Sequence, residues 1–453
     1  MASVYLHDKE KQDILTEPFL DKQRTYPEGS IMERGLASDQ HNINIIEIPK
    51  DLEPYPPKET CWIQRVPEKL RNIREEAYTP QLVSFGPLHY GNPKLKPMQV
   101  HKIKYEQEFW NRDFCKHIPK EERMKFMETE DWLEDFQSKY AVTFESVDRS
   151  ELKRLILQDA CFISELFLRN YEIQLYNEKR QSKTPENLPQ EINRHSEDYI
   201  LRRPWLTEAI RQDLILLENQ LPYSVLTDLF DFIFNPTPVK VPEYLPELDE
   251  KSKRHDFFLK IAAEFFLKYY KFGEPPANGA AAAESTFLDI FQTKEKIDCD
   301  QFKDIPIKHF TDLVRKFMLP VDWMRTNNKD KPSDDSCVRC LYSAKQLDRA
   351  GVKCGPPGPG DKKVRLTDIK KKDGLCLGNG FCCYWINGCC LDLQIPELSV
   401  KDDTECIMRN VMALELFVYP REPFICNYVF LLDQLISTEE DVQFLIDKKF
   451  VSN

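Results

Sequence analysis

The sequence has 453 residues, 41% of them hydrophobic, and a formal net charge of −12. This apolar content is enough for a sizeable core and excludes a globally disordered chain, while the length allows two or three average domains or one large domain. The acidic balance argues against broad binding of nucleic acid, which needs a basic surface to displace counterions.

Targeting signals and cysteines indicate the expected compartment. Charges interrupt the first residues every few positions, so they contain no apolar stretch of the length that a secretory signal peptide needs. No run of about 18 apolar residues, the length that spans a bilayer, occurs in the sequence. Fourteen cysteines without a signal peptide are typical of reduced thiols. We expect a protein that is cytoplasmic or peripheral at a membrane.

The chain divides into a polar N-terminal arm and one long domain. Residues 1–58 are polar and end in a proline-rich stretch, which predicts a disordered arm. For residues 59–453 we expect a single domain of the mainly α (α+β) class, a large helical domain with a small antiparallel β element in its C-terminal third. Its parts are a helical body at 97–320, a β-containing region at 338–400 and C-terminal helices at 403–453.

Apolar residues at helical spacing predict the first helices of the body. Residues 98–118 form one such segment, with Val100 and Ile103 among its apolar positions. Residues 132–140 fit a second helix. Residues 151–171 form a third that is apolar on most sides, as expected for a central buried helix.

Residues 205–234 carry a single apolar stripe at helical intervals. The stripe consists of Ile210, Leu214, Leu217, Leu221 and Val225. Pro222 removes a backbone donor within this stretch, so we expect a kink or a break near Gln220.

Shorter elements with clear end signals follow. Residues 309–319 predict a short helix, and residues 343–351 predict another, which starts with a serine and stops at a glycine. Asn387-Gly388 lies between apolar runs and predicts the two-residue turn of an antiparallel hairpin, because a type I′ turn needs positive φ at both positions. In the last predicted helix, Thr438 is the N-cap and Asp441 the third helical residue.

Several motifs in the first part of the domain point to a known family. They are Arg65-Val66-Pro67, Tyr78-x-Pro80, Ser84-x-Gly86-Pro87-x-His89 and Met98-x-x-His101-Lys102, and further blocks follow in order, among them LQDACFISELFL at 157–168 and MRNVMALELF at 408–417. On these motifs, the chain from about Trp62 to Asn453 resembles the plant family called "domain of unknown function 247". We expect the motif residues to be structural.

The resemblance implies recognition rather than a known reaction. The family has no established chemistry, and some members look like pollen-side determinants of self-incompatibility in grasses, which implies signalling and a protein or peptide partner. Family members usually continue to a C-terminal membrane-spanning helix, whereas this sequence stops at Asn453. The resemblance thus implies membrane attachment in the family, with no spanning segment in this chain.

Ser84 and His89 are the first candidates for catalytic residues. A serine nucleophile needs a base within hydrogen-bond reach, an orienting group and donors for the oxyanion. A nucleophile elbow also needs Gly-x-Ser-x-Gly, and Leu82 occupies the position of its first glycine. We therefore interpret Gly86-Pro87 as a turn that anchors the chain on the core, and keep a hydrolase as the alternative.

Polar residues in apolar surroundings are the second candidates. Glu218, Asn219 and Gln220 are expected inside a helix, where a buried carboxylate with a raised pKa is a candidate general acid or base. We favour the alternative that Glu218 or Asn219 bonds backbone groups left free by Pro222. Asp159 is expected to pair with an arginine or a lysine, and it converges with Glu218 if their helices pack together.

Cysteines offer a third possibility, a structural zinc site. Cys337 and Cys340 have the spacing of a zinc knuckle, and Cys354 and Cys376 are weak further candidates. The sequence has no second Cys-x-x-Cys pair after this one, and cysteine often packs as a small hydrophobic residue, so we expect no metal.

The sequence therefore predicts a recognition or signalling protein that has no catalytic activity and no cofactor, and that binds a protein or peptide partner but no nucleic acid. The alternatives are a hydrolase that uses Ser84 with His89 or Asp159 with Glu218, and a zinc-stabilised interaction module.

Overall fold

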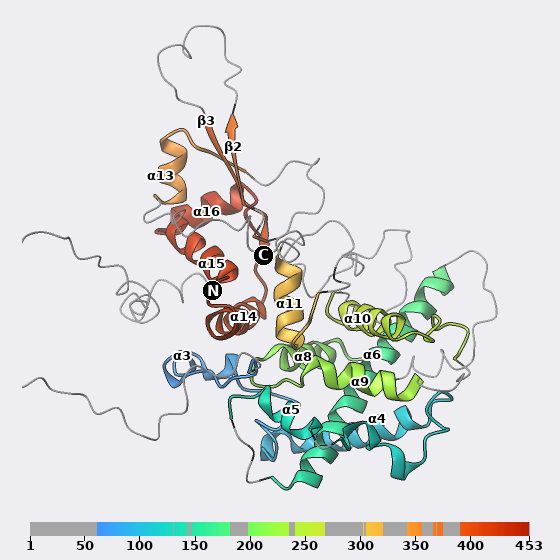
Figure 1. Cartoon of the computed structure of the whole chain (residues 1–453). Coiled ribbons are helices and arrows are strands. Elements are labelled where there is room, and N and C mark those ends of the chain that lie inside the picture. Colours follow the sequence, from blue (N-terminus) through green and yellow to red (C-terminus); the bar gives the residue numbers. More distant parts are fainter. Residues whose placement is uncertain are drawn as a thin grey trace, which may run out of the picture. The chain divides into compact units, whose positions relative to one another are not determined.

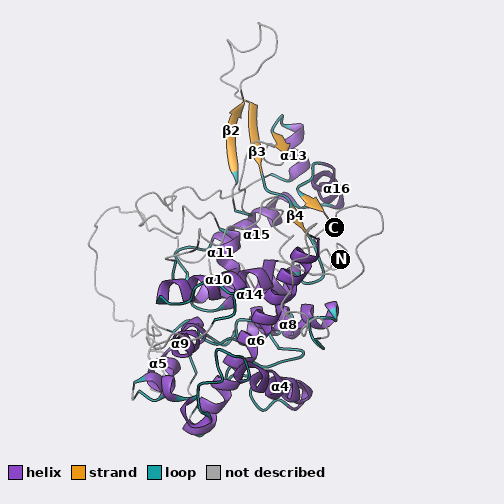
Figure 2. Ribbon diagram, turned by 90° about the vertical axis from the view of Figure 1, so that its right-hand side faces the viewer, coloured by secondary structure: helices purple, strands orange, loops and turns teal. Residues whose placement is uncertain are grey.

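One long helix, α6 (Arg149–Gln181), organises the computed structural model of the chain. Every residue from Leu155 to Gln174 is buried. The reason is that α4 (Gln99–Trp110), α9 (Tyr223–Phe234) and α10 (Lys251–Leu267) pack against this helix (Figures 1 and 2). The prediction of a central buried helix is confirmed.

The structure describes a defined set of residues. They are 61–129, 131–142, 144, 147–181, 198–234, 241–267, 302, 305–319, 342–355, 366–367, 369–374 and 390–452, all within a structural unit that starts at Pro57. The predicted N-terminal arm, residues 1–58, lies outside them. So do Asn387-Gly388 and three of the candidate zinc ligands, Cys337, Cys340 and Cys376.

The described chain is mainly helical, as the sequence predicts. The other α-helices are α3 (Glu68–Arg71), α5 (Trp132–Ser138), α8 (Pro204–Ile215), α11 (Phe310–Met318), α13 (Ala344–Arg349), α14 (Thr404–Val418), α15 (Phe424–Leu435) and α16 (Glu439–Asp447). The 3-10 helices are η1 (Glu75–Ala77), η2 (Pro93–Met98), η3 (Lys120–Glu122) and η4 (Lys125–Met127).

Two helix starts have the capping geometry that the sequence indicates. Ser343 caps α13 and Thr438 caps α16, each in a reciprocal capping box with the third residue of its helix, Gln346 and Asp441 respectively. Gly351 follows α13 with a φ of 88°, the left-handed conformation of a glycine stop. Both predicted helix starts are confirmed.

The buried face of α4 differs from the predicted one. The helix ends at Trp110, well before residue 118. Val100 and Ile103 are 69% and 41% exposed, whereas Lys102 is buried. The physical reason is that the ammonium group of Lys102 forms an ion pair with Asp159 on α6, which turns this side of α4 inward.

The predicted helix over residues 205–234 is two helices, α8 and α9, joined by a nonhelical connection at residues 216–222. Glu218, Asn219 and Gln220 lie in this connection, so their placement inside a helix was wrong. Carbonyl groups at the end of α8 lack the backbone N–H donors of a further helical turn, and side-chain amides take their place. Asn219 Nδ2 donates to the carbonyl oxygen of Asp213 at 2.8 Å, and Gln220 Nε2 donates to that of Leu216 at 2.8 Å.

The strands lie in the C-terminal third (Figures 1 and 2). β1 (Lys353–Gly355), β3 (Cys390–Gln394) and β2 (Lys370–Gly374) form a sheet in that order, and β4 (Leu398–Ser399) pairs in parallel with β5 (Val451–Ser452). β2 and β3 are antiparallel, whereas β1 and β3 are parallel. The expected antiparallel element is therefore present.

The turn predicted at Asn387-Gly388 stays a prediction, because this turn and the run before it lie outside the described residues. A two-residue turn at Asn387-Gly388 places Cys390 opposite Trp385. Trp385 is not among the described residues, and within them Cys390 lies opposite Gly374 of β2. On its other edge, β3 pairs with β1 at residues 392–394.

The segment around Ser84 turns at Gly86. This glycine has a φ of 68°, and a Cβ atom added to it would lie 2.5 Å from the carbonyl oxygen of Gln220 and 3.0 Å from the hydroxyl of Tyr140. Val83 and Phe85 beside it are fully buried. Glycine is required here both by its conformation and by the close approach of the connection, and the predicted turn is confirmed.

Replacing Gly86 by alanine should destabilise the fold by more than about 3 kcal/mol, because left-handed strain adds to an overlap with backbone that cannot move aside. Gly91 is the matched control, since it has a φ of 80° and nothing within 4 Å of an added Cβ. Gly91→Ala should cost only the strain of about 1–2 kcal/mol. Urea unfolding of both variants measures the difference, and equal losses would contradict the role of the Gln220 carbonyl.

Candidate functional site

The opening segment, residues 62–98, has little regular secondary structure, although many of its positions are buried. Ile63, Val83 and Phe85 join the main core, and Val66 and Tyr78 pack with residues of α14 in a second cluster. Buried amides outside helices and sheets need other acceptors. Side chains of α6, of α8 and of the connection between α8 and α9 supply them.

Asp213, at the end of α8, accepts three consecutive backbone hydrogen bonds. Its carboxylate receives the N–H groups of Gln81 at 2.8 Å, Leu82 at 2.7 Å and Val83 at 2.7 Å. Burial raises the pKa of Asp213 to about 6, although these three donors favour the charged form. The carboxylate is thus fully occupied in holding one turn of the opening segment.

Asn219 holds the next part of the same segment. Its Oδ1 accepts the N–H of Phe85 at 2.7 Å, and its Nδ2 donates to the carbonyl oxygen of Val83 at 2.9 Å. Gln220 links the connection to α11, because its Oε1 accepts the N–H of Phe310, the first residue of α11, at 2.9 Å. The two amides join the opening segment, α8 and α11.

Asp159 lies on α6 and is completely buried. It accepts the N–H of Gly86 at 2.8 Å and the ammonium group of Lys102, which also donates to the carbonyl oxygen of Ser84. Burial raises the pKa of Asp159, and the ion pair with Lys102 opposes that rise. The prediction that Asp159 pairs with an arginine or lysine is confirmed.

Glu218 binds the beginning of the opening segment. Its Oε1 accepts the N–H of Val66 at 2.7 Å and the guanidinium group of Arg71. Its Oε2 lies 3.6 Å from Nε2 of His89. Burial, followed by repulsion from Arg71 and Arg65, lowers the pKa of His89 to about 4, so the ring is neutral at pH 7 and this contact is not an ion pair.

These bonds do not assemble a catalytic set. Asp159 binds the segment at Gly86 and Glu218 binds it at Val66, and no hydrogen bond or ion pair joins the two carboxylates in the described structure. His89 faces Glu218, while Ser84 contributes its carbonyl oxygen to Lys102. The expectation that Glu218 or Asn219 bonds backbone groups left free by Pro222 was wrong for Glu218, which binds the N–H of Val66, whereas Asn219 Nδ2 donates to the carbonyl oxygen of Asp213 near the end of α8.

The other motif residues support the same segment. Pro67 precedes α3 as its N-cap, Tyr78, Pro80 and Pro87 are buried, and Arg65 is exposed. His101 stacks on Tyr199, with 4.7 Å between ring centroids. Pro222 lies directly before α9 and is buried.

Asn410 on α14 is a structural residue that sequence reasoning missed. Its Oδ1 accepts the N–H of Leu217 at 2.9 Å, and its Nδ2 donates to the carbonyl oxygen of Ala77 at 2.7 Å. It therefore bridges the connection and the opening segment from a third part of the chain. Nothing in the local sequence signals partners so far away.

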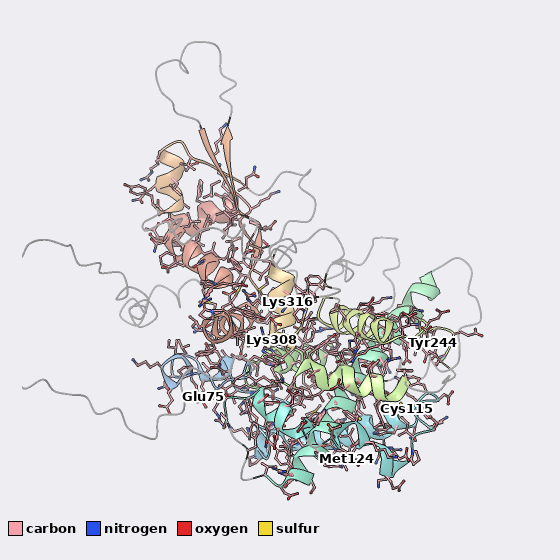
Figure 3. All side chains as sticks on the ribbon, in the orientation of Figure 1. Glu75, Cys115, Met124, Tyr244, Lys308 and Lys316 are labelled. Atoms are coloured by element: carbon pink, nitrogen blue, oxygen red, sulfur yellow. The ribbon has the colours of Figure 1, made fainter. Side chains whose placement is uncertain are left out.

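A polar cluster lies where α11 meets α14, and Lys308 and Lys316 mark it in Figure 3. Asp312 accepts the ammonium group of Lys316 and, at 2.7 Å, the hydroxyl of Tyr419. Lys308 donates to the same hydroxyl at 2.8 Å. Despite burial, the positive charges hold the pKa of Asp312 well below its usual range.

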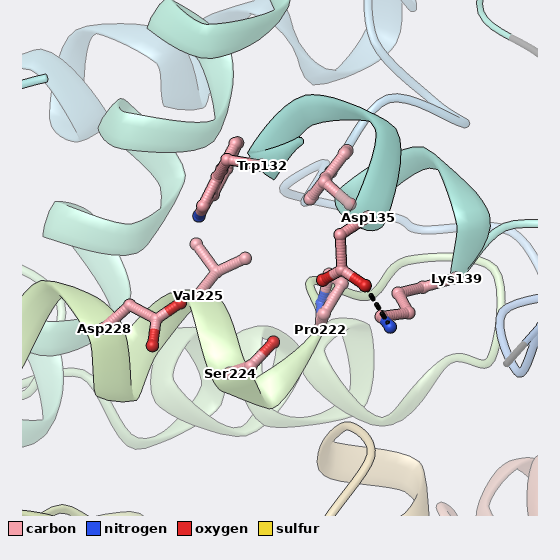
Figure 4. Close-up of a pocket in the computed structure, with 8 residues that line it drawn as sticks. Trp132, Asp135, Lys139, Pro222, Ser224, Val225 and Asp228 are labelled. Carbon is pink, nitrogen blue, oxygen red and sulfur yellow. Dashed lines mark hydrogen bonds and ion pairs between the residues drawn. The ribbon is translucent and has the colours of Figure 1, made fainter. Parts of the chain in front are cut away.

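A shallow pocket lies between α5 and the start of α9 (Figure 4). Trp132 and Val225 line it together with Asp228, and at its rim Lys139 pairs with Asp135 at 2.7 Å. Its enclosed volume of about 10 Å³ has room for about one water molecule.

The described part of the chain contains no group of three or more His, Cys, Asp or Glu side chains placed to hold a metal ion. Cys354, the one candidate zinc ligand within it, lies in β1, where its backbone is opposite Leu393. The other candidates lie outside the described residues.

Comparison with known proteins identifies the family. The family model DUF247, described as plant protein of unknown function, matches residues 63–453. The chain belongs to DUF247. The curated UPF0481 protein At3g47200 of Arabidopsis thaliana is 26% identical to this DUF247 chain over 414 residues, which cover 87% of the chain and 69% of the relative. No solved structure matches at a significant level.

The DUF247 motifs that carried the resemblance now have physical roles. Gly86 allows the Gln220 carbonyl to approach, and Lys102 neutralises Asp159 beneath the turn. Among the described residues of this DUF247 chain, none of the helices combines the length and apolar character needed to cross a membrane.

Asp213→Asn should destabilise the DUF247 fold by about 2–3 kcal/mol at pH 7, because the new amide nitrogen would face a backbone N–H donor and leave it unpaired. Asp348→Asn, at an exposed site on α13, is the control and should leave the unfolding midpoint nearly unchanged. Guanidinium unfolding monitored by circular dichroism measures both. An Asp213 variant as stable as the wild type would refute the anchoring role of this carboxylate.

His89 should make stability fall with decreasing pH. Its pKa is about 4 in the folded chain and 6.5 when unperturbed. Between these values the unfolded chain binds a proton that the folded chain does not. The wild type should therefore lose about 3 kcal/mol relative to His89→Gln between pH 7 and pH 4. Unfolding free energies of both proteins across this range test the effect, and parallel profiles would contradict it.

Proposed function

We propose that this DUF247 protein is a non-catalytic recognition or signalling protein that binds a protein or peptide partner. The main support for the proposal is that the buried polar residues of the protein bind the backbone of the opening segment. Asp213, Asp159 and Glu218 each accept backbone N–H groups of the opening segment, and the last two also pair with cations.

The arrangement around Ser84 gives further support. A serine nucleophile needs a histidine that can take its proton. His89 instead lies against Glu218, and burial beside Arg71 and Arg65 lowers its pKa to about 4, which makes the imidazole a weak base. The side chain of Ser84 makes no hydrogen bond within the described structure, and its carbonyl oxygen is held by Lys102. The hydrolase alternative therefore has less support than recognition.

The proposal includes the cellular setting and the type of recognition. We place the protein in the cytoplasm or at the periphery of a membrane, consistent with the absence of a spanning helix among the described residues. Self-incompatibility, which the family resemblance implies, is one instance of such recognition and belongs to the proposal.

Two measurements test the proposal: turnover by the purified wild type, and partner capture with the wild type and with Ser84→Ala. The purified wild type should not turn over a panel of nitrophenyl esters, peptide anilides, phosphoesters and glycosides. Proximity labelling in plant tissue should recover the same set of partner proteins with the wild type and with Ser84→Ala, because the serine hydroxyl has no role in the scaffold. Turnover that is lost on replacing Ser84 or His89 would overturn the proposal in favour of a hydrolase.

A further inference from the structure

Six residues at the start of α4 and just before α8 form a surface that we call the α4 patch. They are Val100, His101, Ile103, Lys104, Tyr199 and Arg203. The ring stack of His101 with Tyr199 joins the two chain segments. The patch combines aromatic, cationic and apolar groups, which are the residue types that carry most binding energy at protein interfaces.

The aromatic centre of the patch is held in place before any partner binds. Tyr199 is 46% exposed, and the ring of His101 stacks on it at an interplanar angle of 15°. The guanidinium group of Arg203 lies 4.0 Å from the centre of the same ring, and its Nη1 donates to the carbonyl oxygen of Tyr199 at 2.7 Å. A ring fixed in this way loses little freedom on binding, which favours affinity.

The charge of the patch is positive and largely uncompensated. Arg203 is exposed and forms no ion pair in the part of the chain that the structure describes. Lys104 reaches only Glu108, at 3.9 Å, and Glu108 also pairs with Arg169. In a chain with a net charge of −12, such a site attracts carboxylates, which arginine binds in a bidentate geometry.

Apolar groups lie directly beside these charges. Val100 and Ile103 are 69% and 41% exposed and are three residues apart on α4, so they share one side of the helix. Lys104 follows Val100 by four residues and His101 by three, which places it between the apolar pair and the ring stack. A partner that covers the patch must therefore offer an acidic and an apolar side chain close together.

We infer that the α4 patch binds an acidic peptide segment of a partner protein, with a carboxylate on Arg203 and Lys104 and an apolar side chain against Tyr199, Val100 and Ile103. The inference rests on the proposed function and names the surface and the partner chemistry for it. A nucleic acid or an anionic membrane fits less well, because the negative charge of the whole chain repels large polyanionic surfaces.

Selection from a displayed library of random twelve-residue peptides against the full chain tests the inference. Selected peptides should carry Asp or Glu beside an apolar residue. Fluorescence anisotropy then measures their binding to the wild type and to Tyr199→Ala/Arg203→Glu, which should bind at least about tenfold more weakly, as expected for the loss of two central interface residues. Arg203→Lys should give an intermediate loss, because lysine keeps the charge but not the bidentate geometry.

A matched control replaces the same residue types at another exposed site. Tyr342→Ala/Arg349→Glu changes an exposed tyrosine and an exposed arginine beside and on α13, and should bind the peptides as tightly as the wild type does. All three variants should keep the wild-type unfolding midpoint.

Four outcomes would overturn the inference. Peptides without acidic residues would exclude the proposed partner chemistry, and a library without binders would remove its support. Peptides that bind the Tyr199/Arg203 variant as well as the wild type would place recognition on another surface and leave the proposed function intact. Concentration-dependent self-association that this variant abolishes would assign the patch to a second copy of the chain.

Discussion

The structure depends on one constraint: buried backbone amides of the opening segment lie outside helices and sheets and must find acceptors among distant side chains. Asp159, Asp213, Glu218 and Asn219 provide them across sequence separations of 73 to 152 residues. A buried acceptor that loses its donor is costly, and so is a donor that loses its acceptor. Each bond therefore favours one placement of the segment against the helices, and Asn410 adds α14 to the same arrangement.

This constraint explains why the polar residues that look catalytic in the sequence bind backbone groups of the opening segment. A buried acid with a raised pKa is a common feature of active sites, but buried structural ion pairs and carboxylates bound by backbone amides share that feature. In this chain the carboxylates point at backbone N–H groups of the opening segment, and the imidazole of His89 lies beside Glu218 in a cationic setting. The resulting scaffold is rigid at its centre and leaves its surface for recognition, which is the function that we propose.

The sequence was sufficient to predict those features of the helices that depend on residues within or next to the helix. The burial of α6 follows from its apolar residues on most sides, and the starts of α13 and α16 follow from Ser343 and Thr438. The break predicted near Gln220 is confirmed, since Gln220 lies in the nonhelical connection 216–222, but the side chains of Asn219 and Gln220 that complete the end of α8 were not predicted. The described partners of β3, β1 and β2, come from other parts of the sequence, which local patterns do not indicate. For the candidate site, the ion pair of Asp159 was predictable from its apolar surroundings, whereas the partners of Glu218 depend on tertiary contacts alone.

Hydrogen exchange at the amides of residues 81–86 tests the central claim most directly. If side chains of α6, α8 and the α8–α9 connection hold this segment, the N–H groups of Leu82, Val83, Phe85 and Gly86 should be protected nearly as well as those in the middle of α6. They should then exchange only on global unfolding. Exchange at the rate of an exposed loop, with α6 still protected, would contradict the account.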